Sequence, residues 1–503
     1  MLSSAICLCL VHVSVASRIL VVFPVPDQSH SVLGDAVVKT LLQDHHEVTY
    51  LSVYPKKTSN QNLTYIDISS VIGGRNGVST RSANDILRAG PRIAQDALQH
   101  EGFRELLLDP AATFDAVIAD WYYSGLLAPL AALYECPLIW YTSGDVSWRT
   151  LKLMHEEPSP AYSVDMLSGS LPSSPFTTKD RLYQLGMQIY LNFWAYYTTH
   201  FEEIPAYDVI YRTPFQLRKR LLPPFEDLVY NGSLLLVNSH PPLAQALPLP
   251  LNAKHVGGHH IGQVSKPLPE TLQTSLDNAK HGVIFISLGA DIERRMNKKQ
   301  QEHLLDALAR LEQVVLYQVE EAIEYVPRNI RILKKAPRLS ILNHPKTKLF
   351  ITDGSLSSLM EATHNEIPII AVPTAVDQNV NVDLMVSRGL GLRVDFTQYF
   401  PWHVEGAAKE ILGNYSFKSN AEHASLIFQR RITAPNSDLL HWVNLVISTR
   451  GAAHLRSPAL QVPALERYHA DLWILVFLAI WFLSKVLKVI QVHLKEDLDK
   501  KNQ

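Results

Sequence analysis

Residues 18–53 read RILVVFPVPDQSHSVLGDAVVKTLLQDHHEVTYLSV, and this stretch decides the fold. Its first part, Arg18–Phe23, is a continuous apolar run, which is typical of a strand buried on both faces of a parallel sheet. Gly34–Leu42 has the spacing of a helix, and His46–Val53 has the composition of a second strand. A strand, a loop, a helix and another strand in this order predict a βαβ unit and hence a doubly wound α/β domain.

The same alternation continues through the first half of the chain. Three more apolar runs of strand length follow: Phe114–Ala119, Pro137–Tyr141 and Leu234–Asn238. Ser124–Tyr134 is a predicted helix between two of them. Residues 158–225 mix aromatic, proline and charged residues without a clear period, and we interpret them as helical insertions that cover this domain. The pattern predicts an N-terminal Rossmann-like domain over residues 17–250.

A second series of strands begins after a segment rich in proline, glycine and histidine, which indicates a linker at residues 251–280. Val283–Ser287 (VIFIS) is its first predicted strand. The later β-rich runs are Val314–Tyr317, Ile330–Leu333, Leu349–Ile351 and Ile369–Val372, and the helical stretches are Lys299–Leu311, Ser357–Thr363 and Val380–Ser387. We therefore expect a second Rossmann-like domain with its return helices at residues 281–470, and a cleft between the two domains.

Composition excludes several classes of protein. The 503 residues exceed one ordinary core, and 47% hydrophobic with 19% charged residues excludes a disordered chain. The formal net charge of −2 gives no reason to expect a nucleic-acid partner. The cysteines are Cys7, Cys9 and Cys136, which exclude a cysteine-based zinc or iron–sulfur centre.

The N-terminus has features of a secretory leader. Ile6–Ala16 is mostly apolar and too short to span a bilayer, and Ser14 and Ala16 are the small residues that cleavage after Ala16 requires. We predict a signal peptide at residues 1–16; an N-terminal anchor or a buried strand is the alternative. Three N-x-[ST] sequons agree with a lumenal chain and predict glycosylation at Asn62, Asn231 and Asn414.

The C-terminus predicts a membrane anchor. Leu472–Leu483 is uninterrupted apolar sequence, and the stretch extends to Ile490 with two lysines near its end. We expect a transmembrane helix at residues 471–490 and a cytosolic tail at residues 491–503, since the tail is rich in lysine. A buried or interfacial amphipathic helix is the alternative. Lys500 and Lys501 resemble a dilysine retrieval signal of endoplasmic reticulum membrane proteins.

Residues 348–396 carry a longer pattern, in which ITDGSLSSLMEATHNEIPIIAVPTAVDQNVNV resembles THGGxxSxxEAxxxGVPxxxxPxxxDQxxNA, the signature of animal UDP-glycosyltransferases (the UDP-glucuronosyltransferase family). The likeness includes FPVPDQSHSVLGDAVVKTLL near the start, VGGHHIG in the linker and the final YHADLW before the anchor. The resemblance implies the GT-B architecture of two Rossmann-like domains. It also implies a type I protein of the endoplasmic reticulum membrane with its catalytic domains in the lumen.

The resemblance implies inverting transfer of a hexosyl group from a UDP-sugar to a hydroxyl, and it implies no bound metal, because in such enzymes a helix dipole and side chains stabilise the leaving diphosphate. An acceptor hydroxyl is a poor nucleophile, and a histidine is a suitable base near neutral pH. His30 follows the first strand and matches the base of the family, and Asp120 follows the strand FDAVIA and matches its aspartate partner. Strand ends are where α/β sheets place their sites. An N-cap for the following helix is the alternative role of Asp120.

The donor site expected from the resemblance contains both kept and changed positions. The kept positions are Glu361, Asp377, Gln378 and Asn381, and Ser357 and Ser358 stand where the family often has small polar phosphate contacts. The donor site is also expected to include Ser287, Gly289, Gly354 and Ser355. In the family, Glu361 bonds the ribose, and Asp377 with Gln378 bonds the sugar. Asp353 replaces a phosphate-contacting histidine, and an anion there opposes a diphosphate by about 1–4 kcal/mol. An N-cap is the other reading of Asp353.

Four other positions depart from the family pattern. Lys335 replaces a tryptophan that stacks on uracil, and Arg338 replaces a glutamine that bonds the base or ribose. Either cation could instead attract the phosphates. Glu366 replaces a glycine, and Ala290 replaces a serine.

Two functions are consistent with these residues. The first is an active membrane-anchored transferase that uses UDP-glucose or UDP-glucuronate, needs no cofactor and acts on small lipophilic hydroxylated acceptors. The second is an inactive relative that serves as a binding or regulatory partner in the same membrane, as a homo- or hetero-oligomer. The preserved His30 and Asp120 favour the first, and the changed donor residues favour the second.

Overall fold

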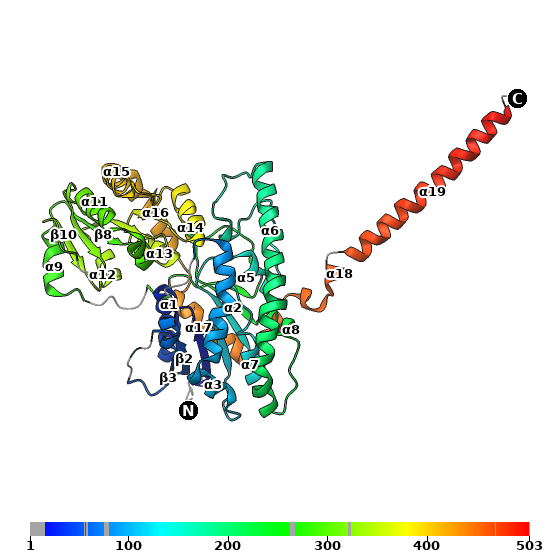
Figure 1. Ribbon diagram of the computed structural model, residues 1–503, viewed down its shortest axis with the longest axis horizontal. Coiled ribbons are helices and arrows are strands. Elements are labelled where there is room, and N and C mark those ends of the chain that lie inside the picture. Colours follow the sequence, from blue (N-terminus) through cyan, green and yellow to red (C-terminus); the bar gives the residue numbers. More distant parts are fainter. Residues whose placement is uncertain are drawn as a thin grey trace, which may run out of the picture. The chain divides into compact units, whose positions relative to one another are not determined.

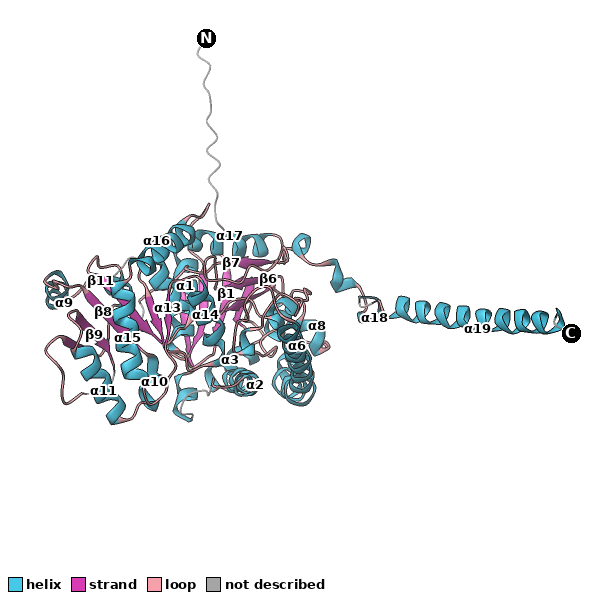
Figure 2. Cartoon of the chain, turned by 90° about the horizontal axis from the view of Figure 1, so that it is seen from above, coloured by secondary structure: helices cyan, strands magenta, loops and turns pink. Residues whose placement is uncertain are grey.

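A computed structural model of the chain describes residues 16–54, 56, 59–74, 80–261, 267–319, 323–467 and 469–501. Residues 1–15 of the predicted leader, with Cys7, Cys9 and Ser14, therefore lie outside the described residues. The chain up to Leu455 forms one compact unit that contains two lobes, each built on a parallel sheet with helices on both sides (Figures 1 and 2). The predicted α/β class with two Rossmann-like sheets is confirmed.

The first lobe is built on a seven-stranded sheet in the order β3-β2-β1-β4-β5-β6-β7. Its strands are β1 (Arg18–Phe23), β2 (Glu47–Ser52), β3 (Leu63–Asp67), β4 (Ala116–Asp120), β5 (Leu138–Thr142), β6 (Leu234–Val237) and β7 (Ala253–His255). The order reverses between β1 and β4, which are paired with Val22 opposite Ala119. The chain therefore leaves β1 and β4 side by side at the carboxyl edge of the sheet, where α/β proteins bind their ligands.

Eight helices belong to the first half of the chain described here: α1 (Gln28–Gln43), α2 (Ala83–Gln99), α3 (Glu101–Leu108), α4 (Pro129–Tyr134), α5 (Trp148–Leu153), α6 (Thr178–Thr198), α7 (Ile204–Leu217) and α8 (Phe225–Val229). Helix α1 begins well before the predicted Gly34, because the Asp27 carboxylate caps it by accepting from the Ser29 amide at 2.7 Å. Helix α4 begins later than the predicted Ser124, at Pro129, where proline is favoured.

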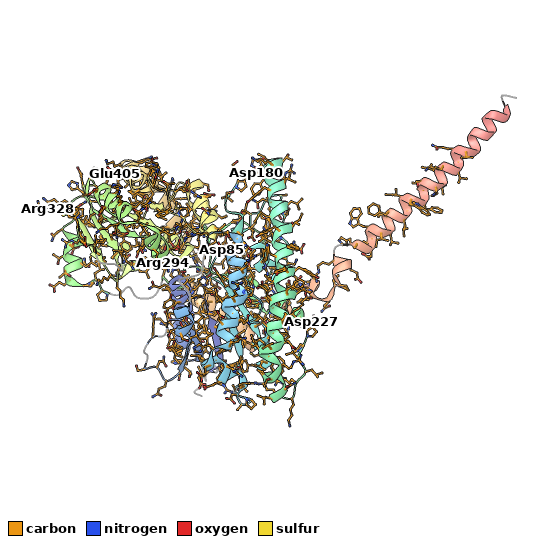
Figure 3. The ribbon with its side chains drawn as sticks, in the orientation of Figure 1. Asp85, Asp180, Asp227, Arg294, Arg328 and Glu405 are labelled. Carbon is orange, nitrogen blue, oxygen red and sulfur yellow. The ribbon has the colours of Figure 1, made fainter. Side chains whose placement is uncertain are left out.

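Residues 158–225 form the helices that we expected as insertions. Asp180, labelled in Figure 3, lies in the first turn of α6. A π-helical turn, Thr199–Glu203, joins α6 to α7. The buried carboxylate of Glu203 holds this turn to the lobe, since it accepts from the Ser124 hydroxyl at 2.7 Å and from the Gly125 amide at 2.8 Å.

The second lobe is built on a six-stranded sheet in the order β10-β9-β8-β11-β12-β13. The strands are β8 (Val283–Ser287), β9 (Val314–Gln318), β10 (Ile330–Leu333), β11 (Thr347–Thr352), β12 (Ile369–Ala371) and β13 (Gly391–Arg393). The helices are α9 (Glu270–Asp277), α10 (Gly289–Arg295), α11 (Lys298–Ala309), α12 (Arg338–Leu342), α13 (Leu356–His364), α14 (Val376–Ser387), α15 (Phe400–Gly413) and α16 (Tyr415–Gln429). Here the order reverses between β8 and β11.

The predicted linker at residues 251–280 contains regular structure: β7 extends the first sheet and α9 packs on the second. Another helix returns to the first lobe. Helix α17 (Pro435–Ser448) buries Leu439, Val443 and Val446 in the same core as β1 and α1 (Figure 1).

Residues 456–501 belong to a separate unit, which ends in helix α19 (Ala470–Lys501). Its segment Ala470–Val492 has 23 residues with a mean hydropathy of 2.1 and is, among the described residues, the one helix long and apolar enough to cross a membrane. This agrees with the position of the predicted anchor.

Candidate active site

The two residues predicted as base and partner are brought together at the reversal point of the first sheet. His30 lies in the first turn of α1 rather than in the preceding loop, and Asp120 is the last residue of β4. His30 Nδ1 is 2.6 Å from Asp120 Oδ2, and both side chains are buried. A carboxylate can only accept, so Nδ1 carries the proton and Nε2 is left with the lone pair. This arrangement suits a general base held and oriented by an acid.

The surroundings of His30 tune its basicity. Burial lowers the pKa of the imidazole, but the charge and hydrogen bond of Asp120, with smaller contributions from Asp27 and Asp377, outweigh it and raise the pKa above the ordinary 6.5. The ring of Tyr122 stands edge-on to the imidazole, with centroids 5.5 Å apart. The imidazole of His30 is therefore held from several sides.

Ser143 is a site residue that the sequence analysis did not identify. Its Oγ is 3.1 Å from His30 Nε2, the nitrogen that has to receive a proton. Ser143 directly follows β5, which is the next strand of the sheet after β4, with Asp120 opposite Tyr141. Applying the strand-end argument to Pro137–Tyr141 would have found it.

Two hydrogen bonds join the lobes near this point. The amide of Val376 donates to the Thr80 carbonyl at 2.9 Å, and the amide of Leu171 donates to Asp383 Oδ2 at 3.0 Å. They set the first turn of α14 beside the base. Burial raises the pKa of Asp377 in that turn to about 6, with further raising by Asp353 and Asp27. An acceptor-side base and a donor-side carboxylate thus share one electrostatic environment.

The second sheet supplies the predicted donor elements at its own reversal point. Ser287 of β8 pairs with Thr352 of β11, so the turns that follow these strands lie side by side. Gly289 and Gly354 in these turns have φ of +78° and +84°, which a residue with a Cβ rarely adopts. A Cβ on Gly289 would lie 3.5 Å from Asp353 Oδ2. The backbone at both turns is therefore close to the aspartate that replaces the histidine of the family.

Asp353 is bonded within the protein on both of its oxygens. Oδ1 accepts from the Ser355 amide at 3.1 Å and from the Thr352 hydroxyl at 3.0 Å, and Oδ2 accepts from Gln378 Nε2 at 3.0 Å. Ser355, not Asp353, is the N-cap residue of α13, so the N-cap reading was wrong by position. Burial raises the pKa of Asp353. Asp353 accepts a hydrogen bond from the Ser355 amide at the N-terminus of α13, so this amide is not available to a phosphate.

Glu361, expected to bond the ribose, is paired with Arg338. Arg338 Nη2 donates to Glu361 Oε1 at 2.9 Å, and Nε lies 2.5 Å from Oε2. Arg338 Nη1 also donates to the Ser358 hydroxyl at 3.3 Å. Burial would raise the pKa of Glu361, but the charge of Arg338 and contact with His260 hold it below its usual range. His260 Nε2 is 3.6 Å from Oε1, and this histidine belongs to the VGGHHIG motif, to which the sequence analysis assigned no role.

The remaining predicted residues fall into three groups. Ser357 and Asn381 are buried in α13 and α14. Lys335 is exposed after β10, and Ala290 is exposed at the start of α10. Asn62, Asn231 and Asn414, the predicted glycosylation sites, are all exposed.

Glu366 has a φ of +60°, a left-handed conformation that favours glycine, and this explains why a glycine is expected at its position. Lys418 Nζ holds it by bonding its carbonyl at 3.0 Å and its carboxylate at 3.1 Å. Glu366 follows the C-terminal end of α13 and is therefore far from the N-terminus of that helix. In the described part of the chain, no group of three or more His, Cys, Asp or Glu side chains could hold a metal ion.

Comparison with known proteins shows the family to which the chain belongs. A family described as UDP-glucoronosyl and UDP-glucosyl transferase matches residues 84–499. UDP-glucosyltransferase 2 of Dactylopius coccus is 28% identical over 89% of this chain and 87% of its own length. UDP-glucuronosyltransferase 2B15 of Rattus norvegicus is 24% identical over 88% of this chain and 87% of its own.

Solved glycosyltransferases share the fold at low identity. A UDP-glucosyltransferase of Polygonum tinctorium, solved in complex with 3,4-dichloroaniline, has a TM-score of 0.57 at 16% identity and covers 86% of this chain and 99% of that one. A Phytolacca americana enzyme, solved with UDP-2-fluoro-glucose and pterostilbene, has a TM-score of 0.54 at 17% identity over 86% of this chain and 99% of that one. The architecture is therefore GT-B. Because the family profile covers most of the chain, the protein belongs to the UDP-glucuronosyl and UDP-glucosyl transferase family, whose members transfer sugars from UDP-sugars.

Proposed function

We propose that the protein transfers a glucosyl or glucuronosyl group from a UDP-sugar to a hydroxyl of a small lipophilic acceptor, with inversion at the anomeric carbon. The observation that carries this proposal is the 2.6 Å contact between His30 Nδ1 and Asp120 Oδ2 at the reversal point of the first sheet. A buried imidazole with a carboxylate behind it can take a proton and stabilise the cation that results.

The acceptor O–H proton passes to His30 Nε2, the oxygen forms a bond to the anomeric carbon, and the bond from that carbon to the diphosphate breaks with its electron pair leaving on UDP. Asp120 stabilises the imidazolium through Nδ1. In the free protein the Ser143 hydroxyl is the hydrogen-bond partner of His30 Nε2, so the acceptor hydroxyl has to replace Ser143 at this nitrogen.

The N-terminus of α13 is the proposed place of the leaving diphosphate. Free backbone N–H groups and the helix dipole stabilise an anion there without a metal or other cofactor. Ser357 and Ser358 in its first turn are buried beside it. Asp377 and Gln378, in the first turn of α14, are the proposed contacts of the sugar hydroxyls.

We place the protein in the endoplasmic reticulum membrane, with α19 as its single span and the lobes in the lumen. The apolar segment Ala470–Val492 and the three exposed sequon asparagines support this orientation. Expression in animal cells followed by endoglycosidase digestion tests it: a lumenal chain loses mass, whereas an undigested chain contradicts the orientation.

An inactive binding partner is the second candidate. It is favoured by the hydrogen bond of Gln378 to Asp353 and the ion pair of Arg338 with Glu361, which occupy four donor-site residues within the protein. Incubation of the full-length protein with UDP-glucose and UDP-glucuronate and a panel of phenols decides between the two. Conjugates detected by mass with one donor support the transferase, and no conjugate with either donor supports the binding partner.

A further inference from the structure

Arg338 and Glu361 form an ion pair inside the donor lobe, although they come from different helices. Arg338 is the first residue of α12, and Glu361 lies in the middle of α13. The guanidinium reaches both carboxylate oxygens, at 2.9 Å and 2.5 Å. The Nη2–Oε1 contact is a hydrogen bond, whereas the Nε–Oε2 contact is a close ion pair. Charge-assisted contacts between a guanidinium and a carboxylate are among the strong polar contacts of proteins. The pair therefore fixes the direction in which Glu361 points.

The same arginine also engages a serine of the phosphate end. Arg338 Nη1 donates to Ser358 Oγ at 3.3 Å, and Ser355 Oγ donates to the same oxygen at 2.9 Å. Arg338 thus connects Glu361, which is expected at the ribose, with Ser358 near the expected diphosphate. Ser358 is in turn bonded to Ser355. A nucleotide that enters this site meets polar groups that are already bonded to each other.

Burial makes this pair hard to rearrange. The Glu361 side chain is 2% exposed and the Arg338 side chain is 27% exposed. If Arg338 moved away to a phosphate, Glu361 would remain as a buried carboxylate without its counter-ion, which is strongly unfavourable. The arginine is therefore better placed to retain Glu361 than to compensate the charge of Asp353.

One acceptor position of Glu361 is nevertheless unused. Oε2 lies close to Arg338 Nε without hydrogen-bond geometry, and it accepts no hydrogen bond from any described residue. Both ring nitrogens of His260, beside the same carboxylate, also lack hydrogen-bond partners among the described residues. Buried polar atoms of this kind are usually satisfied by a ligand or by water. The two hydroxyl groups of a ribose can donate hydrogen bonds to such a carboxylate.

We propose that Arg338 determines the affinity for the donor by closing the ribose subsite: it holds Glu361 in an ion pair, and the ribose hydroxyls of a uridine nucleotide have to displace the guanidinium before they can bond that carboxylate. This rests on the proposed function, because it takes Glu361 as the ribose contact. Charged carboxylate acceptors bind hydroxyls more strongly than neutral groups do, so release of Glu361 is expected to strengthen nucleotide binding about tenfold.

Calorimetric titration of the full-length protein with UDP tests the proposal. Arg338→Gln removes the cation and keeps a polar side chain, and it should bind UDP about tenfold more tightly than the wild type. Arg338→Lys, which has no fork, should gain less. The matched control is Arg310→Gln, because Arg310 also pairs with a carboxylate of the same lobe, that of Glu405 on α15, which is labelled in Figure 3; its affinity should equal that of the wild type.

A ribose-specific probe separates the mechanism from a general charge effect. The gain in Arg338→Gln should disappear with 2′,3′-dideoxy-UDP and in the double variant Arg338→Gln, Glu361→Gln. Unchanged or weaker UDP binding by both Arg338 variants overturns the proposal, and so does an equal gain with the dideoxy nucleotide. If one of these two contradicting results is obtained and the wild type still transfers sugar, only the inference about Arg338 fails. If neither the wild type nor Arg338→Gln binds UDP at millimolar concentration, the proposed function fails as well.

Discussion

Gln378, in the first turn of α14, donates a 3.0 Å hydrogen bond to Asp353 at the end of β11. The amide expected to hold the sugar is therefore bonded to the residue that replaces a phosphate-contacting histidine. The same Gln378 accepts from the amides of Thr374 and Ala375 through Oε1, so its orientation is fixed at both ends. The predicted donor residues are bonded to one another, while the proposed base, His30, keeps its contact with Asp120.

Removal of the charge at Asp353 is expected to strengthen donor binding. Asp353→Asn keeps an oxygen for the Ser355 amide but removes the anion beside the proposed diphosphate, and should tighten UDP-glucose binding about tenfold or more. Calorimetry measures this, with Asp395→Asn, an exposed aspartate of the same lobe, as the control. Equal affinity of Asp353→Asn and wild type would show that the diphosphate lies elsewhere.

Donor binding is also expected to depend on pH. Burial raises the pKa of Asp377 to about 6, so this carboxylate loses charge as the pH falls from 7.5 to 5. Burial also raises the pKa of Asp353. Protonation of His30 acts in the same direction. UDP-glucose, which does not itself ionise in this range, should therefore bind more tightly at pH 5. In Asp377→Asn the slope should be smaller; affinity that rises with pH would contradict the assignment.

The dyad predicts the shape of the pH–rate profile. His30 must be neutral to act as a base, and its pKa is raised above 6.5, so kcat/KM should increase with pH through a midpoint above that value. Asp120→Asn removes the carboxylate that raises this pKa, so the midpoint should move down while the rate falls about 10³-fold or more. A merely structural role of Asp120 would lower the rate without moving the midpoint.

Ser143 offers a test of how the proton reaches the base. If the acceptor hydroxyl replaces Ser143 at Nε2, as proposed, Ser143→Ala removes a competitor worth about 1 kcal/mol, and kcat/KM should stay within about fivefold of the wild type. Steady-state rates with one phenol acceptor measure this. A loss of 10²-fold in a folded variant would instead make Ser143 a proton relay between acceptor and His30.

Most strands could be predicted from sequence because a strand inside a parallel sheet is apolar on both faces, as in Arg18–Phe23 and Val283–Ser287. β3 was missed because its residues are only partly buried and alternate with polar ones, and β7 because three residues inside a proline-rich segment give no period. Helix starts were misplaced where side chains set them, as Asp27 does for α1.

The dyad could be predicted because the carboxyl ends of neighbouring parallel strands meet at one edge, which brings His30 to Asp120 across 90 positions of sequence. The pairing of Arg338 with Glu361 could not. It depends on how α12 packs beside α13, and the charges alone were equally consistent with an arginine bound to phosphate. Sequence alone therefore does not say whether Arg338 strengthens or weakens donor binding. The structure places its guanidinium on a carboxylate.

The central claim is that His30, held by Asp120, is the base for sugar transfer, and the rate of conjugate formation by His30→Asn tests it most directly. The assay uses the full-length protein, its better donor and one phenol acceptor, with His200→Asn, a more exposed histidine, as the matched control. The account predicts a measurable rate for the wild type and the control and a loss of about 10²–10⁴-fold in His30→Asn. Conjugate formed by His30→Asn at the wild-type rate would contradict it.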